Sequence, residues 1–322
     1  MADVSKIAWT RSTFNGWVGC TKVSPGCDHC YASVSTPTRT LGVQWGAGQP
    51  RRRTSESNWR GPLKWNHRAR EEANSGKVLP SWERIWNRPG FWPVFCSSLA
   101  DVFDNEVDPE WRADLFRLIR ATPNLTWLLL TKRIGNANSM IAAALSNEDI
   151  GHSVEFALWP WPNVWLGATI VDQAEADRDI PKLLAVPAAK RFVSYEPALG
   201  LVEWRFAFAD LRTACCHVCG FRTNQVGGLC PNDGATLRGD IGLDWIIVGG
   251  ESDQPGMKAR PFDIAWARST VRQCKAAGVP VFFKQGGSHV IFDGKRMELR
   301  NRSGADLSEF PADIQVQEFP NA

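Results

Sequence analysis

The sequence predicts an α/β protein built as a partial parallel (β/α) barrel, and three observations support this fold class. Short apolar runs recur along the 322 residues, and each run stops at a polar group. Segments whose apolar residues have helical spacing alternate with these runs, which is the order of βαβ units with right-handed crossovers. The runs are apolar throughout, as in strands that are covered on both faces of a parallel sheet.

The expected elements follow in chain order. A first strand is expected at residues 7–10, and six longer runs lie at 94–98, 127–131, 164–169, 191–196, 245–250 and 279–284. Helices are expected at 109–121, 136–145, 173–184 and 262–277. In the first of these helices the apolar residues at helical spacing are Trp111, Leu115, Leu118 and Ile119. The last helix ends before Gly278, a residue type that commonly ends helices.

Two regions interrupt this alternation. Residues 46–76 are rich in Arg and Lys with interleaved Trp, and they would either bind phosphate and stack bases or form a solvated charged face. Residues 209–239 carry their own cysteines and look like an insert between two strands. The expected domains are therefore a barrel over 1–208 and 240–322, with 46–76 as a basic insertion, and a small insert over 209–239.

The composition excludes some classes of protein. With 43% hydrophobic and 22% charged side chains, the chain does not resemble a disordered protein. The net charge of +3 permits a nucleic-acid partner without requiring one. No stretch approaches the roughly 18 consecutive apolar residues of a membrane span. Residues 1–10 also lack the pattern of a secretory signal, so no membrane partner and a cytoplasmic location are expected.

Polar side chains follow each of the six longer runs. They are Ser97, Ser98 and Asp101; Thr131, Lys132 and Arg133; Thr169 and Asp172; Ser194 and Glu196; Glu251 and Ser252; Lys284 and Gln285. A single polar strand end can simply mark a loop. In a parallel barrel, however, all of these ends open onto the face where active sites are built, so their succession favours a shared site.

A cysteine-rich loop gives the sharpest local signal. Cys20, Cys27 and Cys30 are separated by six and then two residues. Three thiolates on one loop can hold three irons of a four-iron, four-sulfur (4Fe-4S) cluster and leave the fourth iron open. A structural zinc ion needs four protein ligands, and His29 could be the fourth only by turning back into the loop. The spacing favours the cluster, and zinc is the alternative. The loop follows the expected first strand, so it would project over the same face.

At this point the chain resembles the radical S-adenosylmethionine (radical SAM) superfamily, whose members carry a three-cysteine cluster loop after the first strand of a partial barrel. More closely, it resembles a phage-encoded family with the same three-cysteine motif. The resemblance runs through Gly-Cys-Thr-Lys-Val-Ser-Pro-Gly-Cys-Asp-His-Cys-Tyr (19–31), Leu-Thr-Lys-Arg (130–133), Ser-Tyr-Glu-Pro (194–197), Val-Gly-Gly-Glu-Ser (248–252) and Phe-Phe-Lys-Gln (282–285).

The resemblance implies a mechanism and its cofactors. A 4Fe-4S cluster on Cys20, Cys27 and Cys30 would receive an electron from a donor and cleave S-adenosyl-L-methionine, and the resulting 5′-deoxyadenosyl radical would abstract a hydrogen atom. The implied cofactor contacts are His29 or Tyr31 for the adenine, Ser97, Ser98 and Asp101 for the methionine amino group, and Lys132, Thr169 and Glu196 for the ribose, the carboxylate or the substrate.

The chain departs from the superfamily pattern in two places. The common superfamily loop has three residues between its first two cysteines, whereas this loop has six. The Gly-Gly-Glu motif that usually follows the second strand and binds the methionine amine is absent there. Gly249-Gly250-Glu251 has that composition but follows a late strand, so its role cannot be carried over.

The resemblance also implies a substrate. Some members of the phage family are associated with thymine hypermodification, which implies an isomerase that rearranges an amino-acid-decorated thymine, such as glycyl-thymine, in phage DNA. Arg51 to Arg53 and Arg60 to Arg70 would then grip the DNA backbone, and the base would leave the stack to reach the barrel. The alternatives are a radical enzyme of nucleic-acid repair or RNA modification, and a non-catalytic zinc-stabilised protein that binds nucleic acid.

The second cysteine group resembles a zinc ribbon. Cys216, Cys219 and Cys230 are its expected ligands, and Asp233, Cys215 or His217 would complete the tetrahedron. An insert of about 30 residues has little core of its own, so a structural metal would stabilise it. A ribbon that has lost its metal and a second iron–sulfur cluster are the alternatives.

Overall fold

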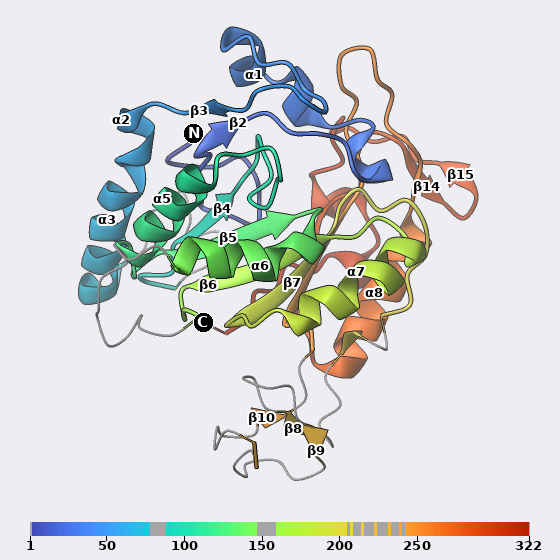
Figure 1. The fold of residues 1–322 in the computed structure, drawn as a ribbon. Helices are drawn as coiled ribbons and strands as arrows, with labels where there is room; N and C mark the ends of the chain where they lie inside the picture. Colours follow the sequence, from blue (N-terminus) through green and yellow to red (C-terminus); the bar gives the residue numbers. More distant parts are fainter. Residues whose placement is uncertain are drawn as a thin grey trace.

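The computed structural model describes residues 2–77, 88–146, 159–204, 207–208, 214–215, 222–223, 231–232, 238–239 and 242–321. Its centre is a sheet of seven strands in the order β1-β4-β5-β6-β7-β11-β13. Every neighbouring pair in this sheet is parallel. The sheet curls into half a barrel, and helices lie along it (Figure 1). The predicted partial barrel is thus confirmed as a mixed α/β fold with a curled, all-parallel sheet.

The bounds of the main elements agree closely with the expected ones. The strands are β1 (Ser12–Thr13), β4 (Pro93–Cys96), β5 (Thr126–Thr131), β6 (Val164–Thr169), β7 (Lys190–Tyr195), β11 (Trp245–Gly249) and β13 (Val281–Gln285). The helices between them are α5 (Pro109–Arg120), α6 (Ile134–Leu145), α7 (Gln173–Ala185) and α8 (Ile264–Ala277). Asp108, Asp172 and Asp263 each accept a backbone N–H at the start of their helix, which fixes where it begins.

The first strand is not where the sequence predicted it. Residues 7–10 form a turn in which the backbone N–H of Thr10 donates to the carbonyl of Ile7 at 3.2 Å. The strand lies instead at Ser12–Thr13, opposite Val94 and Phe95 of β4. The apolar run is buried for another reason, because Trp9 packs among the aromatic rings inside the half-barrel.

The two faces of the sheet have separate cores, since side chains alternate along each strand. On β7, Val193 and Tyr195 face the helices while Phe192 faces the interior. The interior core is largely aromatic and consists of Trp9, Phe91, Phe95, Leu128, Trp165, Phe192, Trp245, Ile247, Phe282 and Phe319. The interior is therefore filled with packed rings, and a cavity can remain only where these rings end.

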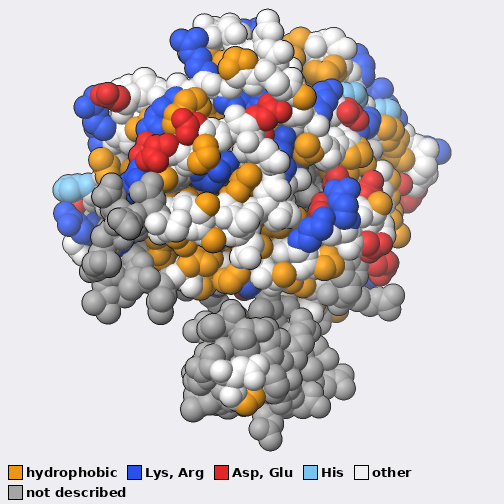
Figure 2. Space-filling model, viewed as in Figure 1, with side chains coloured by type: hydrophobic (Ala, Val, Ile, Leu, Met, Phe, Trp, Pro, Cys, Tyr) orange, Lys and Arg blue, Asp and Glu red, His pale blue; other side chains and the backbone are white. Residues whose placement is uncertain are grey.

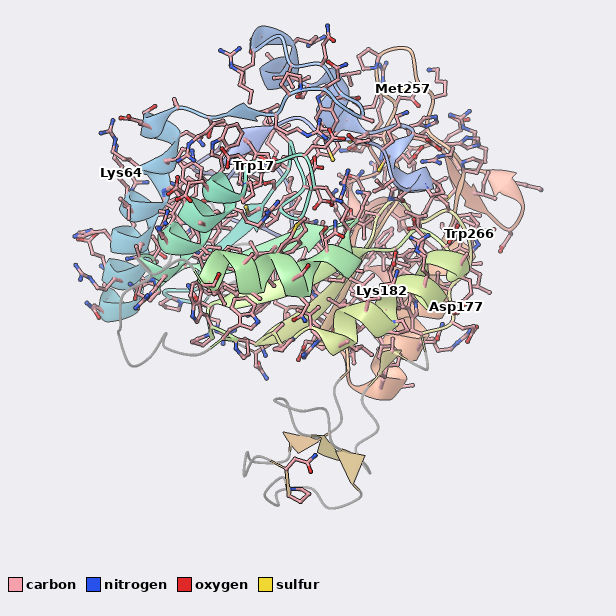
Figure 3. All side chains as sticks on the ribbon, in the orientation of Figure 1. Trp17, Lys64, Asp177, Lys182, Met257 and Trp266 are labelled. Carbon is pink, nitrogen blue, oxygen red and sulfur yellow. The ribbon has the colours of Figure 1, made fainter. Side chains whose placement is uncertain are left out.

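The region at 46–76 is folded onto the barrel. It contains β3 (Arg52–Arg53), which pairs with β2 (Trp17–Val18), followed by α2 (Glu56–Trp59) and α3 (Gly61–Ser75). Trp65 on α3 is buried, and Lys64 lies on the exposed side of the same helix (Figure 3). Trp17 of β2 lies within the core beneath this region.

Arg51 does not belong to an exposed basic face, contrary to its expected role in gripping DNA. Its side chain is 1% exposed, and its Nε donates to Asp104 at 2.7 Å. Its other nitrogens donate to the carbonyls of Gly46 and Gln49 and to the hydroxyl of Thr21. Because its guanidinium is enclosed by these acceptors, Arg51 holds the chain segments of Thr21, Gly46 and Asp104 together and cannot reach a phosphate.

Short elements complete the described chain. They are α1 (Thr36–Thr40), β12 (Phe262–Asp263), β14 (Val290–Phe292), β15 (Lys295–Arg296) and 3₁₀ turns at Pro25–Cys27, Tyr31–Val34, Leu307–Glu309 and Ala312–Ile314. The predicted helix at 262–277 begins two residues late because Phe262 and Asp263 pair in β12 with β14. None of the helices in the described ranges has both the length and the apolar character needed to cross a bilayer.

The expected insert at 209–239 is described only in part. β8 (Ala214–Cys215), β9 (Arg222–Thr223) and β10 (Arg238–Gly239) form an antiparallel sheet in the order β10-β8-β9. The expected ligands Cys216, Cys219, Cys230 and Asp233, and the alternative His217, lie outside the described residues. The barrel segments on either side of the insert meet, since the N–H of Leu243 donates to the carbonyl of Ala207 at 2.9 Å.

Candidate functional site

A cavity of about 430 Å³ opens at the carboxyl ends of the parallel strands. It is lined by nearly all of the site residues that the sequence predicted, namely Cys20, Cys27, Cys30, Tyr31, Ser97, Ser98, Asp101, Lys132, Thr169 and Glu196. The predicted convergence of these positions on one site is therefore observed. His29 does not line the cavity, because its ring is directed to the Glu251 carboxylate, with Nδ1 3.0 Å from Oε2. Four of the expected polar strand ends also lie outside the cavity lining, namely Asp172, Glu251, Ser252 and Gln285.

The two-residue period of the strands explains why these side chains meet. Phe192 points into the half-barrel, so Ser194 and Glu196, two and four residues later, point the same way at the strand's end. On β13, likewise, Phe282 points into the half-barrel, and Lys284, two residues later, points the same way into the cavity. The aromatic interior core thus forms the apolar floor of the cavity, and the polar strand ends form its walls.

The cysteine loop is shaped by glycine and a short 3₁₀ turn. Gly19 has a φ of +113°, which L side chains rarely adopt, and its N–H donates to the carbonyl of Leu99. Ser24 caps the turn at Pro25–Cys27 by accepting from the N–H of Gly26. A side chain at Gly26 would place its Cβ 2.8 Å from Cγ1 of Val171, so only glycine fits against the segment that follows β6.

The three cysteines of the loop are free thiols that face one cavity. Within the described ranges, no three His, Cys, Asp or Glu side chains are gathered as they are around a bound metal ion. Burial is the main cause that raises the pKa of Cys20 to about 11, with a further contribution from Asp101. Arg133 opposes this shift, because its guanidinium lies 3.3 Å from the Cys20 sulfur.

Asp101 organises the wall between β4 and β5. Its Oδ1 accepts from the hydroxyl of Thr131 at 2.6 Å and from the N–H of Phe103 at 2.9 Å. Its Oδ2 accepts from the N–H of Lys132 and from Arg133. With four donors already on its two oxygens, the carboxylate orients Arg133 and the β5 turn rather than offering an unused oxygen to a ligand.

The serine pair after β4 is also partly engaged. The amide nitrogen of Asn15 donates to the hydroxyl of Ser98 at 3.0 Å, and its oxygen accepts from the N–H of Leu99. Ser97 is buried beside Cys96 and lines the cavity. Asn15 therefore fixes the orientation of the turn that carries both serines.

A second polar group surrounds Glu196 on the other side of the cavity. Its Oε2 accepts from the indole N–H of Trp9 and from the hydroxyl of Ser194, each at 3.1 Å. Its Oε1 lies 2.9 Å from Nζ of Lys284. Gly249 makes room for it, since a Cβ there would lie 2.7 Å from Oε1. The carboxylate is thus held at a defined position with its charge compensated.

Thr169 and Trp45 both line the cavity with buried hydrogen-bonding groups that have no partner among the described residues, and the Trp45 group is its indole N–H. The Thr169 group is a hydroxyl, which can both donate and accept. Thr169 is 3% exposed. An unpaired buried hydroxyl costs free energy, which a ligand that hydrogen-bonds to it would recover. Lys132, which follows β5, also lines the cavity and is half-buried.

Some cavity residues are not indicated by the sequence. Trp9 and Trp45 line the cavity, and nothing in the sequence indicates that Trp9 contacts Glu196, which lies 187 positions away. The sequence marks Arg133 and Lys284 only as polar strand ends, although each makes an ion pair with a predicted site residue. Arg133 and Asp101 follow the neighbouring strands β5 and β4, whereas Lys284 on β13 and Glu196 after β7 are separated by β11. Both pairings depend on the strand order, which the sequence does not supply.

Residues 4–311 match the sequence model of a protein family described as "Protein of unknown function (DUF5131)". The chain belongs to this family. The DUF5131 match covers the whole half-barrel and therefore includes the cysteine loop and every cavity-lining strand end. No curated protein and no solved structure matches the chain.

Proposed function

We propose that this protein is a radical SAM enzyme that acts on a modified base in DNA, with the isomerisation of an amino-acid-decorated thymine as its reaction. The observation that carries the proposal is the convergence of Cys20, Cys27 and Cys30 with the polar strand ends on one cavity. A 4Fe-4S cluster and S-adenosyl-L-methionine, when bound, would supply a 5′-deoxyadenosyl radical that abstracts a hydrogen atom.

The kinds of residue present match the ligands of such a cluster, although the three thiols of the described loop are not gathered as they would be around bound metal. Three free thiols face the cavity, and its lining contains no fourth cysteine and no histidine within the described chain. His29, the alternative fourth ligand of a zinc site, is held by Glu251. Three thiolate ligands with one open position are what a cluster that binds a further molecule requires, whereas a structural zinc site is closed by four protein ligands.

The roles of the strand ends can be assigned from their contacts. Arg133 and Asp101 orient the wall beside Cys20. Thr169, with its unpaired hydroxyl, and Lys132 are free to bind the cofactor or the substrate. Glu196 and Lys284 form an ion pair with no net charge, in which Glu196 can accept and Lys284 can donate a hydrogen bond to a polar group of a ligand. The apolar floor, which includes Phe95 and Leu130, excludes water.

A nucleic-acid substrate is supported by the surface of α3. Four basic side chains are exposed on or next to this helix, namely Arg60, Lys64, Arg68 and Arg70. Elsewhere on the face in Figure 2, Lys and Arg side chains are interspersed with Asp and Glu, so no single field of positive charge covers this face. We place the contact with the DNA backbone on α3, with Arg51 excluded by its burial.

We also propose a structural zinc ion in the insert. The support is the antiparallel order β10-β8-β9, with Cys215 at the end of β8, because ribbon-like zinc sites are built on such short antiparallel strands. Its test is the zinc content of the purified protein before and after the replacement of Cys216, Cys219 and Cys230 by serine.

The test of the proposed function is anaerobic purification, iron and sulfide analysis, reduction, and an assay for 5′-deoxyadenosine. We expect about four irons per chain, lost in Cys20→Ala, Cys27→Ala and Cys30→Ala. Cys274→Ala is the matched control, because this cysteine is buried in α8 away from the cavity, and it should keep its iron. Zinc in place of iron, with no cleavage of S-adenosyl-L-methionine, would leave a zinc-stabilised binding protein instead.

The substrate is tested separately by isotope transfer. DNA that carries a deuterated glycyl-thymine should deliver deuterium into 5′-deoxyadenosine. Transfer from labelled RNA or from damaged DNA, with none from the modified thymine, would instead assign the enzyme to RNA modification or to repair.

A further inference from the structure

The half of the cysteine loop that contains Cys27 and Cys30 is attached to the end of β11. Glu251, which follows β11, is 8% exposed, and its Oε2 lies 3.0 Å from Nδ1 of His29. Its carboxylate also accepts from the backbone N–H of Arg260 and from the guanidinium of the same residue. Arg260 then donates to the carbonyl of Pro25 at 3.0 Å. Glu251 thus reaches the loop directly at His29 and, through Arg260, at Pro25.

The other half of the loop is held by different groups. Arg133 donates to the sulfur of Cys20 at 3.3 Å and to the carbonyl of Thr21 at 2.7 Å. The N–H of Gly46 donates to the carbonyl of Cys20 at 3.1 Å. None of these contacts involves Glu251 or Arg260, so the two halves of the loop have separate supports.

The backbone of Glu251 is itself fixed by close contacts that only glycine permits. A Cβ at Gly250 would lie 2.2 Å from the carbonyl oxygen of Gly286, and one at Gly287 would lie 2.1 Å from that of Glu251. The carbonyl of Glu251 accepts from the N–H of Ser288 at 2.8 Å. A side chain that extends from so constrained a backbone is a rigid attachment point.

We infer that Glu251, acting with Arg260, is the positioning residue of the cysteine loop, and that it sets the placement of Cys27 and Cys30 while Cys20 is placed by Arg133. This assigns a role to the Gly249-Gly250-Glu251 motif: it supports the cysteine loop from outside the cavity. The consequence for iron binding rests on the proposed function, whereas the positioning role does not.

The charges around Glu251 favour its ionised state. Burial alone would raise the pKa of this carboxyl, but hydrogen bonds from Arg260 and His29 outweigh burial and hold the pKa below its ordinary value. A carboxylate with charge-assisted bonds on both oxygens is more strongly attached than a neutral group in the same place. Replacement by the neutral isostere should therefore loosen the loop without changing its shape.

The test is hydrogen exchange of the metal-free protein, followed by mass spectrometry of peptides from the loop. The backbone N–H groups of Cys27, Asp28 and Cys30 are hydrogen-bonded within the loop and report on its opening. In Glu251→Gln and Arg260→Ala we expect these amides to exchange about tenfold faster or more, as the loss of a charge-assisted hydrogen bond predicts. The amides of Gly19 and Gly46, which report on the Cys20 half, should keep their wild-type rates.

Lys258→Ala is the matched control, because Lys258 lies in the same segment, is 90% exposed and pairs only with Asp253 in the described chain. It should leave all loop amides unchanged. Wild-type exchange at Cys27 and Cys30 in Glu251→Gln, or equal acceleration of both halves of the loop and of β5, would overturn the positioning role.

Iron analysis of the same variants separates this inference from the proposed function. If wild-type protein binds iron, Glu251→Gln should lose it faster in the presence of a chelator, while Lys258→Ala should not. If no iron binds to the wild type but the two halves of the loop still respond separately in hydrogen exchange, the proposed function fails and the positioning role stands.

Discussion

Arg51 and Arg52 are adjacent in the sequence but occupy opposite environments. Arg51 is enclosed by Asp104, Gly46, Gln49 and Thr21, whereas Arg52 is exposed and donates to the carbonyl of Leu41. The sequence predicts a phosphate-binding role for both, because a run of arginines carries no sign of which member is buried. The distinction arises from the position of Asp104, which is 53 residues away.

We expect Arg51→Ala to destabilise the protein by about 3–5 kcal/mol, because the buried carboxylate of Asp104 loses its hydrogen-bonded partner at 2.7 Å and, within the described chain, keeps an ion pair only with Arg133 at 3.8 Å. Arg52→Ala should change the free energy of unfolding by less than about 0.5 kcal/mol, as is usual for surface positions. Urea unfolding of the two variants measures both values. A similar decrease in stability in both would mean that Arg51 is as solvent-accessible as its neighbour.

At the scale of elements, the sequence predicts what depends on local pattern. The helices α5, α6, α7 and α8 follow from apolar residues at helical spacing, and Gly278 marks the end of α8. The strands β4, β5, β6, β7, β11 and β13 follow from the continuous apolar runs. The sequence indicates α3 only as part of a basic insertion, although its buried positions Pro62, Trp65, Ala69 and Glu72 have helical spacing. Glu72 breaks the apolar pattern because it pairs with the buried Arg11.

In the candidate site, too, the features that depend on local pattern were predictable and those that depend on the tertiary arrangement were not. The polar strand ends were predictable, since parallel strands present their carboxyl ends on one face. The contact of Trp9 with Glu196 was not predictable, because it depends on how the turn at 7–10 folds back. The pairing of Lys284 with Glu196 was not predictable either, because it bridges β13 and β7 across β11.

A glycine in β6 shows how tightly adjacent strands are fitted. A Cβ at Gly167 would lie 2.3 Å from the ring of Phe192 on β7. Gly167→Ala should therefore cost about 1–3 kcal/mol by overpacking. On α6 the Cβ of Gly135→Ala would meet its nearest neighbour at 3.7 Å, and this variant should gain about 0.5 kcal/mol from helix propensity. Thermal and urea unfolding measure the change in the free energy of unfolding for each variant. A Gly167→Ala protein that is more stable than wild type would contradict the close contact with Phe192.

Within α7, Asp179 gives a pH dependence with a definite sign. Burial would raise the pKa of this carboxyl, but hydrogen bonds from Arg178 and Lys182 lower it below its ordinary value of 3.8. A lowered pKa in the folded state contributes stability that is present above this value and is lost as the pH falls through the folded pKa. Asp179→Asn should thus be less stable than wild type at neutral pH by up to about 1 kcal/mol, a difference that should shrink as the pH falls below 3.8 and vanish below the lowered folded pKa. Urea unfolding across this range measures it, and a difference independent of pH would exclude the ion pairs as its cause.

At the scale of the whole molecule, we expect the insert at 209–239 to be removable without loss of the barrel. Ala207 and Leu243, on its two sides, are joined by a backbone hydrogen bond. We expect that a short Gly-Ser linker in place of residues 209–239 leaves the free energy of unfolding within about 1 kcal/mol, since closing a short loop there requires no movement of the barrel. Iron content should persist while zinc is lost. Loss of the folded barrel would show that the insert contributes to its core.

The exposed side of α3 allows a test of DNA binding. If α3 contacts phosphates, Lys64→Glu with Arg70→Glu should weaken binding and should reduce the slope of log K against log salt by about 0.9 for each phosphate that is no longer neutralised. Lys275→Glu is the control, because Lys275 is exposed on α8, which lies far from α3 along the sheet (Figure 1). Titration of a labelled duplex at several salt concentrations gives the slopes, and equal slopes in all variants would remove α3 from the interface.

The two tryptophans that line the cavity allow its occupancy to be measured by fluorescence. Both Trp9 and Trp45 line it, and Trp9 also belongs to the chain of touching rings that includes Trp245 and Phe192. A chromophore that absorbs where indole emits would quench these two residues by energy transfer when it enters the cavity. The change in steady-state emission of the unlabelled protein would then report occupancy, and replacing Trp45 by Phe would show how much of this change comes from Trp45 rather than from the other 15 of the chain's 16 tryptophans.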